Sequence, residues 1–278
     1  KLLFTDHHQS HAASAFFPSP FDRAAILTID GVGEWTTASI YTGNKNHLTP
    51  VQEMKYPHSL GMLYSSFTYF LGFRVNSGEY KLMGLAPYGN PFSRRTMNFV
   101  EIIKKYLVSI KDDGSIRLNQ KYFSYSTGNR MINDKDWETL FGIEARCEDK
   151  ELDQRHCDLA SAIQQVTEEI IVKMAYHTKR ITKEDYLCLA GGVALNCVAV
   201  SKILKLNIFK DIWIQPSAGD AGGSLGAAFC GYYLYLNQQR KNPKGVDSMK
   251  GSYLGPSFDI PDIQHVINIH RAKANYFH

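Results

Sequence analysis

Short apolar runs separated by glycine-containing turns mark both ends of this chain. Residues 24–30 form such a run, residues 36–41 alternate apolar and polar positions, and residues 51–55 repeat that alternation. Period-two alternation is typical of half-buried strands, so we predict a strand, its hairpin partner and a third strand. Residues 2–5, 186–189 and 211–214 predict three further short strands.

Helical spacing dominates the centre of the chain. Residues spaced by three or four positions form one helical face: Leu159, Ile163, Val166, Ile170, Met174 and His177. Shorter helices are predicted at residues 12–17 (with the histidines before them), 60–72, 79–85, 98–108, 193–204 and 222–236. Residues 109–155 are polar and irregular, which indicates an insertion. From Lys241 the composition is that of a linker.

The order of these elements indicates the fold class. One strand ends early at Asp30 and a glycine turn, and two later strands are each followed by a glycine-containing turn and a helix. Such alternation is typical of α/β folds. We therefore expect an α/β protein with two α/β lobes that face a nucleotide cleft.

Composition excludes several functional classes. The chain has 278 residues, of which 44% are hydrophobic and 21% charged, as in ordinary globular proteins. A net charge of +4 is too small to indicate a nucleic-acid partner. The five cysteines form no CxxC pair and three lie in apolar contexts, which favours reduced, buried thiols and a cytoplasmic location. No apolar stretch reaches the roughly 18 residues of a membrane span, so we expect no membrane association.

Four side chains indicate a metal site. His7 and His11 are four positions apart, so both imidazoles fall on one face of a helical turn. Asp30 ends a predicted strand and Asp220 lies in a glycine-rich turn, and each offers a carboxylate oxygen. Two imidazoles and two carboxylates suit a first-row metal with room for a phosphate oxygen. The alternatives are two partly exposed histidines on a turn, and an N-cap role for Asp220.

Two glycine pairs follow predicted strands. Gly31 and Gly33 would let backbone amides approach a phosphate, and a plain hairpin turn is the alternative. Gly191 and Gly192 open a predicted helix, where free amides favour anions. Tight packing of the strand against the helix is the alternative for this second pair.

Three polar side chains are each open to two interpretations. Asn196 suits a ligand contact or packing within its helix, and Lys81 suits a phosphate contact or an ordinary surface position. His8 lies between the predicted ligands and suits a supporting or an acid–base role. Because position 8 is His and not Glu, the H-E-x-x-H motif of zinc proteases is absent, and so are the G-x-S-x-G and Walker A motifs.

Five motifs together resemble the O-carbamoyltransferases of nodulation-factor and antibiotic tailoring. They are HHQSHAASAFF from His7, TIDGVGE from Thr28, GEYKLMGLA from Gly78, AGGVALN from Ala190 and GDAGGSLGAA from Gly219. Their order and spacing match along residues 1–257. This region is also similar to the metal-binding subunit that makes threonylcarbamoyl-adenosine in tRNA. The resemblance implies the two-lobed actin, sugar-kinase and heat-shock-chaperone fold (ASKHA, ribonuclease H-like).

The resemblance also implies site roles. His7, His11, Asp30 and Asp220 would bind a divalent metal, iron(II) first and manganese or zinc as alternatives. That metal would hold the phosphate of a carbamoyl-adenylate. The residues implied near the nucleotide are Gly31, Gly33, Lys81, Gly191, Gly192, Asn196 and Gly222. The resemblance does not assign the catalytic base, for which His8 is our candidate by default.

The family's reaction has two stages. Carbamoyl phosphate and ATP first form carbamoyl-adenylate in a YrdC-like domain, and the carbamoyl group then passes to a hydroxyl of a small acceptor. We expect residues 1–257 to be the carbamoyltransferase domain, lacking its N-terminal hairpin. Residues 258–278 would be a linker or the start of the missing YrdC-like domain, so this fragment would not complete a turnover alone. The alternatives are a non-enzymatic nucleotide-binding module and a small-molecule kinase of the same fold, although paired histidines argue against the kinase.

Overall fold

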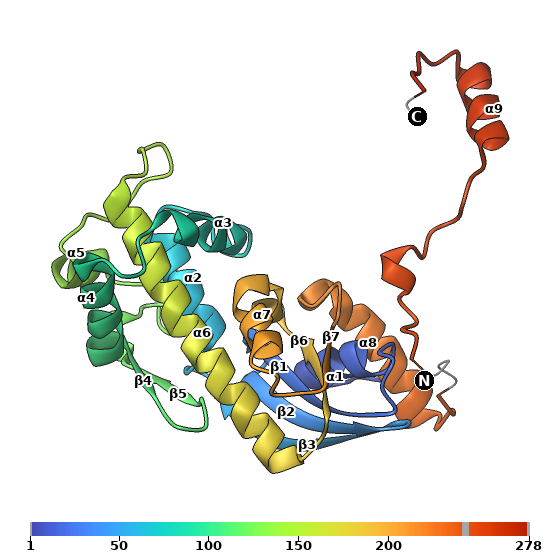
Figure 1. Ribbon diagram of the computed structural model, residues 1–278, viewed down its shortest axis with the longest axis horizontal. Coiled ribbons are helices and arrows are strands. Elements are labelled where there is room, and N and C mark those ends of the chain that lie inside the picture. Colours follow the sequence, from blue (N-terminus) through green and yellow to red (C-terminus); the bar gives the residue numbers. More distant parts are fainter. Residues whose placement is uncertain (1, 241–244, 277–278) are drawn as a thin grey trace.

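A five-stranded mixed sheet forms one lobe of the protein (Figure 1). The computed structural model describes residues 2–240 and 245–276. The strand order is β3–β2–β1–β6–β7, antiparallel from β3 to β1 and parallel from β1 to β7. The strands are β1 Arg23–Gly33, β2 Thr36–Asn44, β3 His47–Lys55, β6 Tyr186–Ala190 and β7 Asp211–Ile214. All five were predicted from the sequence, and the α/β class is confirmed.

Alternate residues of β1 face two separate apolar clusters. Ala25, Leu27 and Ile29 join the larger cluster, to which α2 (Leu60–Phe70) and α6 (Gln154–Thr182) contribute. Ala24 and Ile26 join the smaller cluster with residues of α1 (His7–Phe16), and the end of α8 (Gly223–Phe229) packs on it. Because successive side chains of a strand point to opposite faces, helices cover both faces of this sheet.

The helix α6 connects the two lobes (Figure 1). Asp153 begins the helix with a capping box, since its carboxylate accepts the amides of Arg155 and His156 while His156 Nδ1 accepts the amide of Asp153. The predicted apolar face is confirmed, because all but its last member are buried: Leu159, Ile163, Val166, Ile170 and Met174.

The second lobe is mainly helical, which differs from the expected second α/β lobe. Among the described residues it carries only a two-stranded hairpin, while the large sheet lies entirely in the other lobe. Besides α2 and half of α6, it contains α3 Glu79–Leu85, η1 Ala86–Tyr88, α4 Arg94–Ile102, η2 Ile103–Leu107, β4 Val108–Ile110, β5 Ile116–Leu118, η3 Gln120–Tyr122 and α5 Asp134–Phe141. The helix predicted at residues 98–108 therefore begins earlier and ends in a wider π-type turn.

The prediction of an irregular insertion at residues 109–155 is wrong. Trp137 of α5 is fully buried, and its ring centroid lies 4.7 Å from that of Phe67 and 5.5 Å from that of Phe70. Its Nε1 donates to the carbonyl of Tyr122 at 2.9 Å. Apolar residues scattered without periodicity thus complete a core that pattern reasoning does not detect.

Other differences lie near the glycine turns and the N-terminus. Residues 2–5 form no strand, and Leu2 and Phe4 are 78% and 88% exposed. The helix predicted at residues 193–204 is divided into η4 Gly192–Leu195 and α7 Cys197–Lys205. The helix predicted at residues 222–236 is divided into η5 Asp220–Gly222, α8 and η6 Cys230–Tyr235.

All five cysteines are free, but only Cys188 and Cys230 are buried.

The C-terminal segment extends away from both lobes (Figure 1). It carries η7 Lys250–Ser252 and α9 Ile260–His270, and the α9 side chains are almost all exposed. The start of the predicted linker at Lys241 lies outside the described residues, and the domain boundary at residue 257 stays a prediction. Within the described part of the chain, no helix combines the length and apolar character needed to cross a membrane.

Candidate metal centre

The first turns of α1 bring two imidazoles together. His7 Nε2 and His11 Nε2 lie 3.0 Å apart. His11 is only 1% exposed, while the His7 side chain is 28% exposed. Gly226 of α8 lets that helix approach α1 closely, because a Cβ atom there would stand 1.8 Å from the carbonyl oxygen of Ser10. The alternative of two partly exposed turn histidines therefore does not describe His11.

Asp30, which lies three residues before the last residue of β1, faces both imidazoles. Its Oδ2 lies 3.0 Å from His7 Nε2 and 3.1 Å from His11 Nε2. Its Oδ1 accepts the amide of Gly192 at 3.0 Å. Parallel pairing of β1 with β6 places the glycine turn after β6 beside Asp30. One carboxylate oxygen is thus held by the backbone while the other faces the histidines.

Asp220 completes the cluster from the turn before α8. Its Oδ1 lies 3.3 Å from His7 Nε2 and 3.5 Å from His11 Nε2. The side chain is 78% exposed, so the cluster opens to solvent on this side. The capping residues of η5 and α8 are Gly219 and Gly222, without a side-chain cap bond, so the N-cap alternative for Asp220 is not supported.

Electrostatics favour an anionic Asp30 beside these nitrogens. Burial alone would raise the pKa of Asp30, but hydrogen bonds with His11 and His7 hold that pKa well below its usual range. The hydrogen bond with Asp30 raises the pKa of His7 against the opposing effect of burial. The carboxylate and the imidazoles therefore stabilise one another.

The donor atoms fit a metal ion. One atom from each of His7, His11, Asp30 and Asp220 lies within 4.8 Å of all the others. Metal–ligand bonds of about 2.0–2.2 Å place neighbouring ligand atoms about 3.0–3.5 Å apart. The separations between the imidazole nitrogens and the carboxylate oxygens lie in that range. Two nitrogens and two carboxylate oxygens suit a first-row divalent metal.

The glycines predicted near a nucleotide have several different surroundings. A Cβ atom at Gly191, where φ is 88°, would stand 2.3 Å from the carbonyl oxygen of Ile29, and one at Gly222 would stand 2.1 Å from that of Ser217. Close backbone packing therefore accounts for both. Gly31 is different, because the nearest atom to a Cβ there is Met62 Sδ at 3.9 Å. Gly31 thus leaves space beside the cluster.

His8 lies in the interior of the protein and not on the solvent-exposed side of the cluster. Its side chain is buried, with Nδ1 2.6 Å from Thr28 Oγ1 and Nε2 3.0 Å from the carbonyl of Thr36. Burial lowers the pKa of His8 to about 4. Since both ring nitrogens are engaged, this geometry speaks against His8 as the catalytic base.

Asn196 is hydrogen-bonded in the interior, while Lys81 lies on the surface. Asn196 Oδ1 caps α7 through the amide of Ala199, and its amide group exchanges hydrogen bonds of 3.0 Å with Gln164. Lys81 is exposed on α3, and its side chain makes no hydrogen bond or ion pair with the described residues. The packing interpretation thus accounts for Asn196, and the surface interpretation for Lys81.

Ser59 is a supporting residue that sequence reasoning missed. It caps α2, and its hydroxyl also donates to the carbonyls of Asp30, at 3.1 Å, and Gly31, at 2.5 Å. A serine before an apolar helix is a recognisable N-cap signal. The sequence gives no sign, however, that this cap holds the end of β1.

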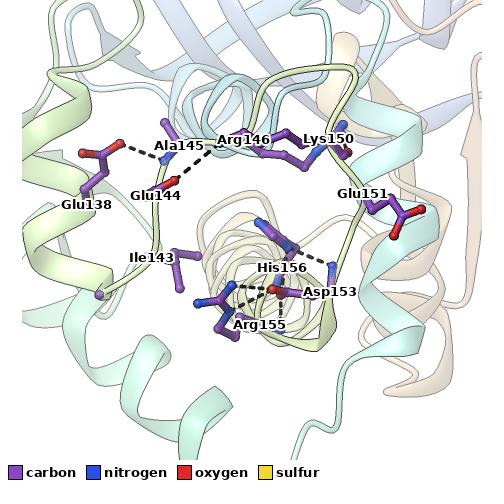
Figure 2. Close-up of a pocket in the computed structure, with 11 residues that line it drawn as sticks. Glu138, Ile143, Glu144, Ala145, Arg146, Lys150, Glu151, Asp153, Arg155 and His156 are labelled. Atoms are coloured by element: carbon purple, nitrogen blue, oxygen red, sulfur yellow. Dashed lines mark hydrogen bonds and ion pairs between the residues drawn. The ribbon is translucent and has the colours of Figure 1, made fainter.

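A cavity of about 560 Å³ beside the start of α6 shares no residue with the predicted ligands (Figure 2). Arg155 pairs with Asp153 and Lys150 pairs with Glu144 (Figure 2). Arg146 donates to the carbonyls of neighbouring loops. Because neighbouring acids and backbone carbonyls engage its cations, this cavity does not compete with the histidine–aspartate cluster as a nucleotide site.

Sequence comparisons relate the chain to known proteins. It is 52% identical over 275 residues to the uncharacterized protein sll1178 of Synechocystis sp., an alignment that covers 99% of this chain and 43% of the relative. It is 37% identical over 259 residues to the nodulation protein NolNO of Sinorhizobium fredii, covering 92% of this chain and 34% of that protein. The chain thus spans less than half the length of these relatives.

A solved structure and a family model also match. The crystal structure of T. kodakarensis HypF aligns with a TM-score of 0.41 and 13% identity, covering 85% of this chain and 37% of that one. The family model described as Carbamoyltransferase N-terminus matches residues 1–229. The chain therefore belongs to the carbamoyltransferase family and matches its N-terminal region.

Proposed function

We propose that this chain holds the carbamoyl-transfer site of an O-carbamoyltransferase with a two-lobed ASKHA-type fold. One observation carries the proposal: His7, His11, Asp30 and Asp220 converge within 4.8 Å in a chain of the carbamoyltransferase family. The carbamoyl donor would be carbamoyl-adenylate, and the acceptor a small hydroxylated molecule.

The four converging residues would hold a divalent metal, iron(II) first and manganese or zinc as alternatives. When bound, such an ion supplies positive charge to the phosphate oxygens of the adenylate. The Gly192 amide fixes the orientation of Asp30 through Oδ1, and Ser59 fixes the strand end that carries it. The free space at Gly31 and the exposed side of Asp220 offer the approach for the adenylate.

The transfer step exchanges one C–O bond for another. The acceptor hydroxyl oxygen attacks the carbamoyl carbon, the bond from that carbon to the adenylate phosphate oxygen breaks, and AMP leaves with the electron pair. The hydroxyl proton passes to a base. We assign that role to a group other than His8, because both His8 nitrogens are already bonded in the interior.

Carbamoyl-adenylate would be made elsewhere in a longer protein. The relatives are more than twice as long as the region they share with this chain. We assign its formation from carbamoyl phosphate and ATP to a YrdC-like domain joined in cis. This chain would then need only to bind the adenylate and the acceptor.

Calorimetric titration with AMP tests the proposal. We expect AMP to bind the metal-loaded chain and to bind the metal-stripped chain at least about tenfold more weakly, because the phosphate loses its positive partner. Adenosine lacks the phosphate and serves as the matched ligand, with no dependence on metal. Equal AMP affinity with and without metal would reject the proposed site.

A further inference from the structure

A second cavity, of about 420 Å³, has an unbalanced positive charge. It lies between the β4–β5 hairpin, the turn η2 and the loop before α2. Lys104, Lys105, Arg117 and His58 line it, and none of its lining residues is acidic. This distinguishes it from the cavity of Figure 2, whose cations are engaged by neighbouring acids and carbonyls.

The alternation of buried and exposed side chains along β5 places Arg117 on the exposed face of the β4–β5 hairpin. Arg117 is directly opposite Ser109 in the β4–β5 register, and both are exposed, while the neighbouring Ile116 and Leu118 are buried. Asn119 Nδ2 donates to the carbonyl of Tyr106 at 3.0 Å. This bond ties η2 to the hairpin and places the lysines of η2 beside Arg117.

Two of the cations have no acidic partner. Lys104 forms an ion pair with Glu169 of α6. Lys105 and Arg117 form no ion pair with any described residue, and Lys105 Nζ lies 5.0 Å from the ring centroid of Tyr106. The cavity therefore carries two uncompensated positive charges.

His58 adds a neutral hydrogen-bond donor. Its Nδ1 accepts the amide of Leu118 at 3.2 Å, so the neutral ring carries its proton on Nε2. Burial lowers the pKa of His58, and the charge of Arg117 lowers it further. The cavity wall thus combines two cations without an acidic partner, a lysine that is paired with Glu169, and an imidazole N–H donor.

We propose that this cavity binds the phosphate group of a small molecule. A phosphate monoester carries a charge close to −2 near neutral pH, which matches two uncompensated cations, whereas a single carboxylate carries half as much. An arginine fork and a lysine ammonium are the side chains that bind phosphate oxygens best in proteins. The cavity shares no residue with the proposed metal centre.

The cavity nevertheless adjoins a segment that supports that centre. His58 is followed by Ser59, whose hydroxyl holds the carbonyls of Asp30 and Gly31. A bound phosphate would therefore lie against the loop that positions the end of β1.

Titration with phosphates at constant ionic strength tests the inference. Inorganic phosphate and glucose 6-phosphate should both bind, and glucose should not. The double variant Lys105→Gln/Arg117→Gln should weaken phosphate binding about tenfold or more, since it removes two charge-assisted hydrogen bonds. The control Arg94→Gln/Lys135→Gln removes two exposed charges outside the cavity and should change binding less than about twofold. Tighter binding of the ester than of free phosphate would identify a phosphorylated metabolite as the ligand, and equal binding would identify the free anion.

Two further readouts locate the binding. Phosphate should shift the His58 imidazole resonances in wild type but not in Lys105→Gln/Arg117→Gln. Phosphate binding at this cavity should persist in His11→Ala, even if the metal is lost, so failure here and failure of the proposed function are separable. Equal weakening in the two double variants, or glucose binding as well as glucose 6-phosphate, would overturn the inference.

Discussion

Gly33 lies directly against the ring of His7: a Cβ atom at position 33 would stand 2.1 Å from His7 Cδ2. Side chains do not tolerate such an approach, so only glycine lets the ring keep its place beside Asp30. The end of β1 therefore provides both a predicted ligand, Asp30, and the space for another. We assign Gly33 to holding His7 in position and not to a phosphate turn.

Replacing Gly33 should disturb metal binding. Gly33→Ala is expected to displace the His7 ring and weaken metal affinity by about tenfold or more, the usual effect of losing a residue that orients a ligand. Gly31→Ala is the matched control, because Met62 Sδ at 3.9 Å is the nearest atom to its Cβ. Competition with a chelator measures both affinities, and equal values in the two variants would contradict this role.

Substitutions of the two glycines after β6 should have different effects, one mainly on the free energy of unfolding and the other mainly on ligand binding. Gly191→Ala combines a φ of 88° with a contact of 2.3 Å to the carbonyl oxygen of Ile29, so it should lower the free energy of unfolding by about 1–3 kcal/mol. Gly192→Ala places a Cβ 3.0 Å from Asp30 Oδ1 and should weaken metal and AMP binding with less change in stability. Urea unfolding and calorimetry measure the two effects. A larger loss of stability in Gly192→Ala than in Gly191→Ala would contradict the packing role that we assign to Gly191.

His8 should behave as a structural residue. His8→Ala removes a partner from Thr28 Oγ1 and from the carbonyl of Thr36 in the interior. We expect a loss of about 1–3 kcal/mol in the free energy of unfolding. A catalytic base would instead be replaceable with little loss of stability, so an unchanged urea midpoint for His8→Ala would contradict our assignment.

The start of α6 should lose stability in acid. Hydrogen bonds from Arg155 lower the pKa of Asp153 to about 2, below its ordinary 3.8. The carboxylate therefore contributes stability that is complete above about pH 4 and is lost as the pH falls toward 2. Asp153→Ala should lower the free energy of unfolding by about 1 kcal/mol near neutral pH and by less in acid. Asp149→Ala is the control, and a pH-independent difference between the variants would count against this account.

Local spacing was sufficient to predict much of the site. His7 and His11 are neighbours because of helical periodicity alone, and Asp30 could be found because the predicted strand ends there, although β1 itself continues to Gly33. The structure brings both histidines together with Asp30 and Asp220. The position of Asp220 depends on how α8 packs on α1, so its sequence context left an N-cap role open.

The remaining errors concern contacts between distant segments. No local pattern links Ser59 to Asp30, because the contact depends on where α2 docks beside β1. Trp137 lies in a polar stretch, and only the tertiary fold shows that its ring fills the core beside Phe67. Asn196 faces Gln164 of α6, which no spacing rule in α7 could indicate.

Metal content is the most direct test of the central claim that the four converging residues form the metal centre of this site. We expect the protein, purified without oxygen, to hold close to one equivalent of iron, manganese or zinc by mass spectrometry. His11→Ala should lose nearly all of it, because His11 is a buried ligand. His265→Ala is the control. Because His265 lies on the exposed helix α9, this variant should keep its metal. Metal-free wild type after reconstitution, or equal metal content in His11→Ala, would contradict the account.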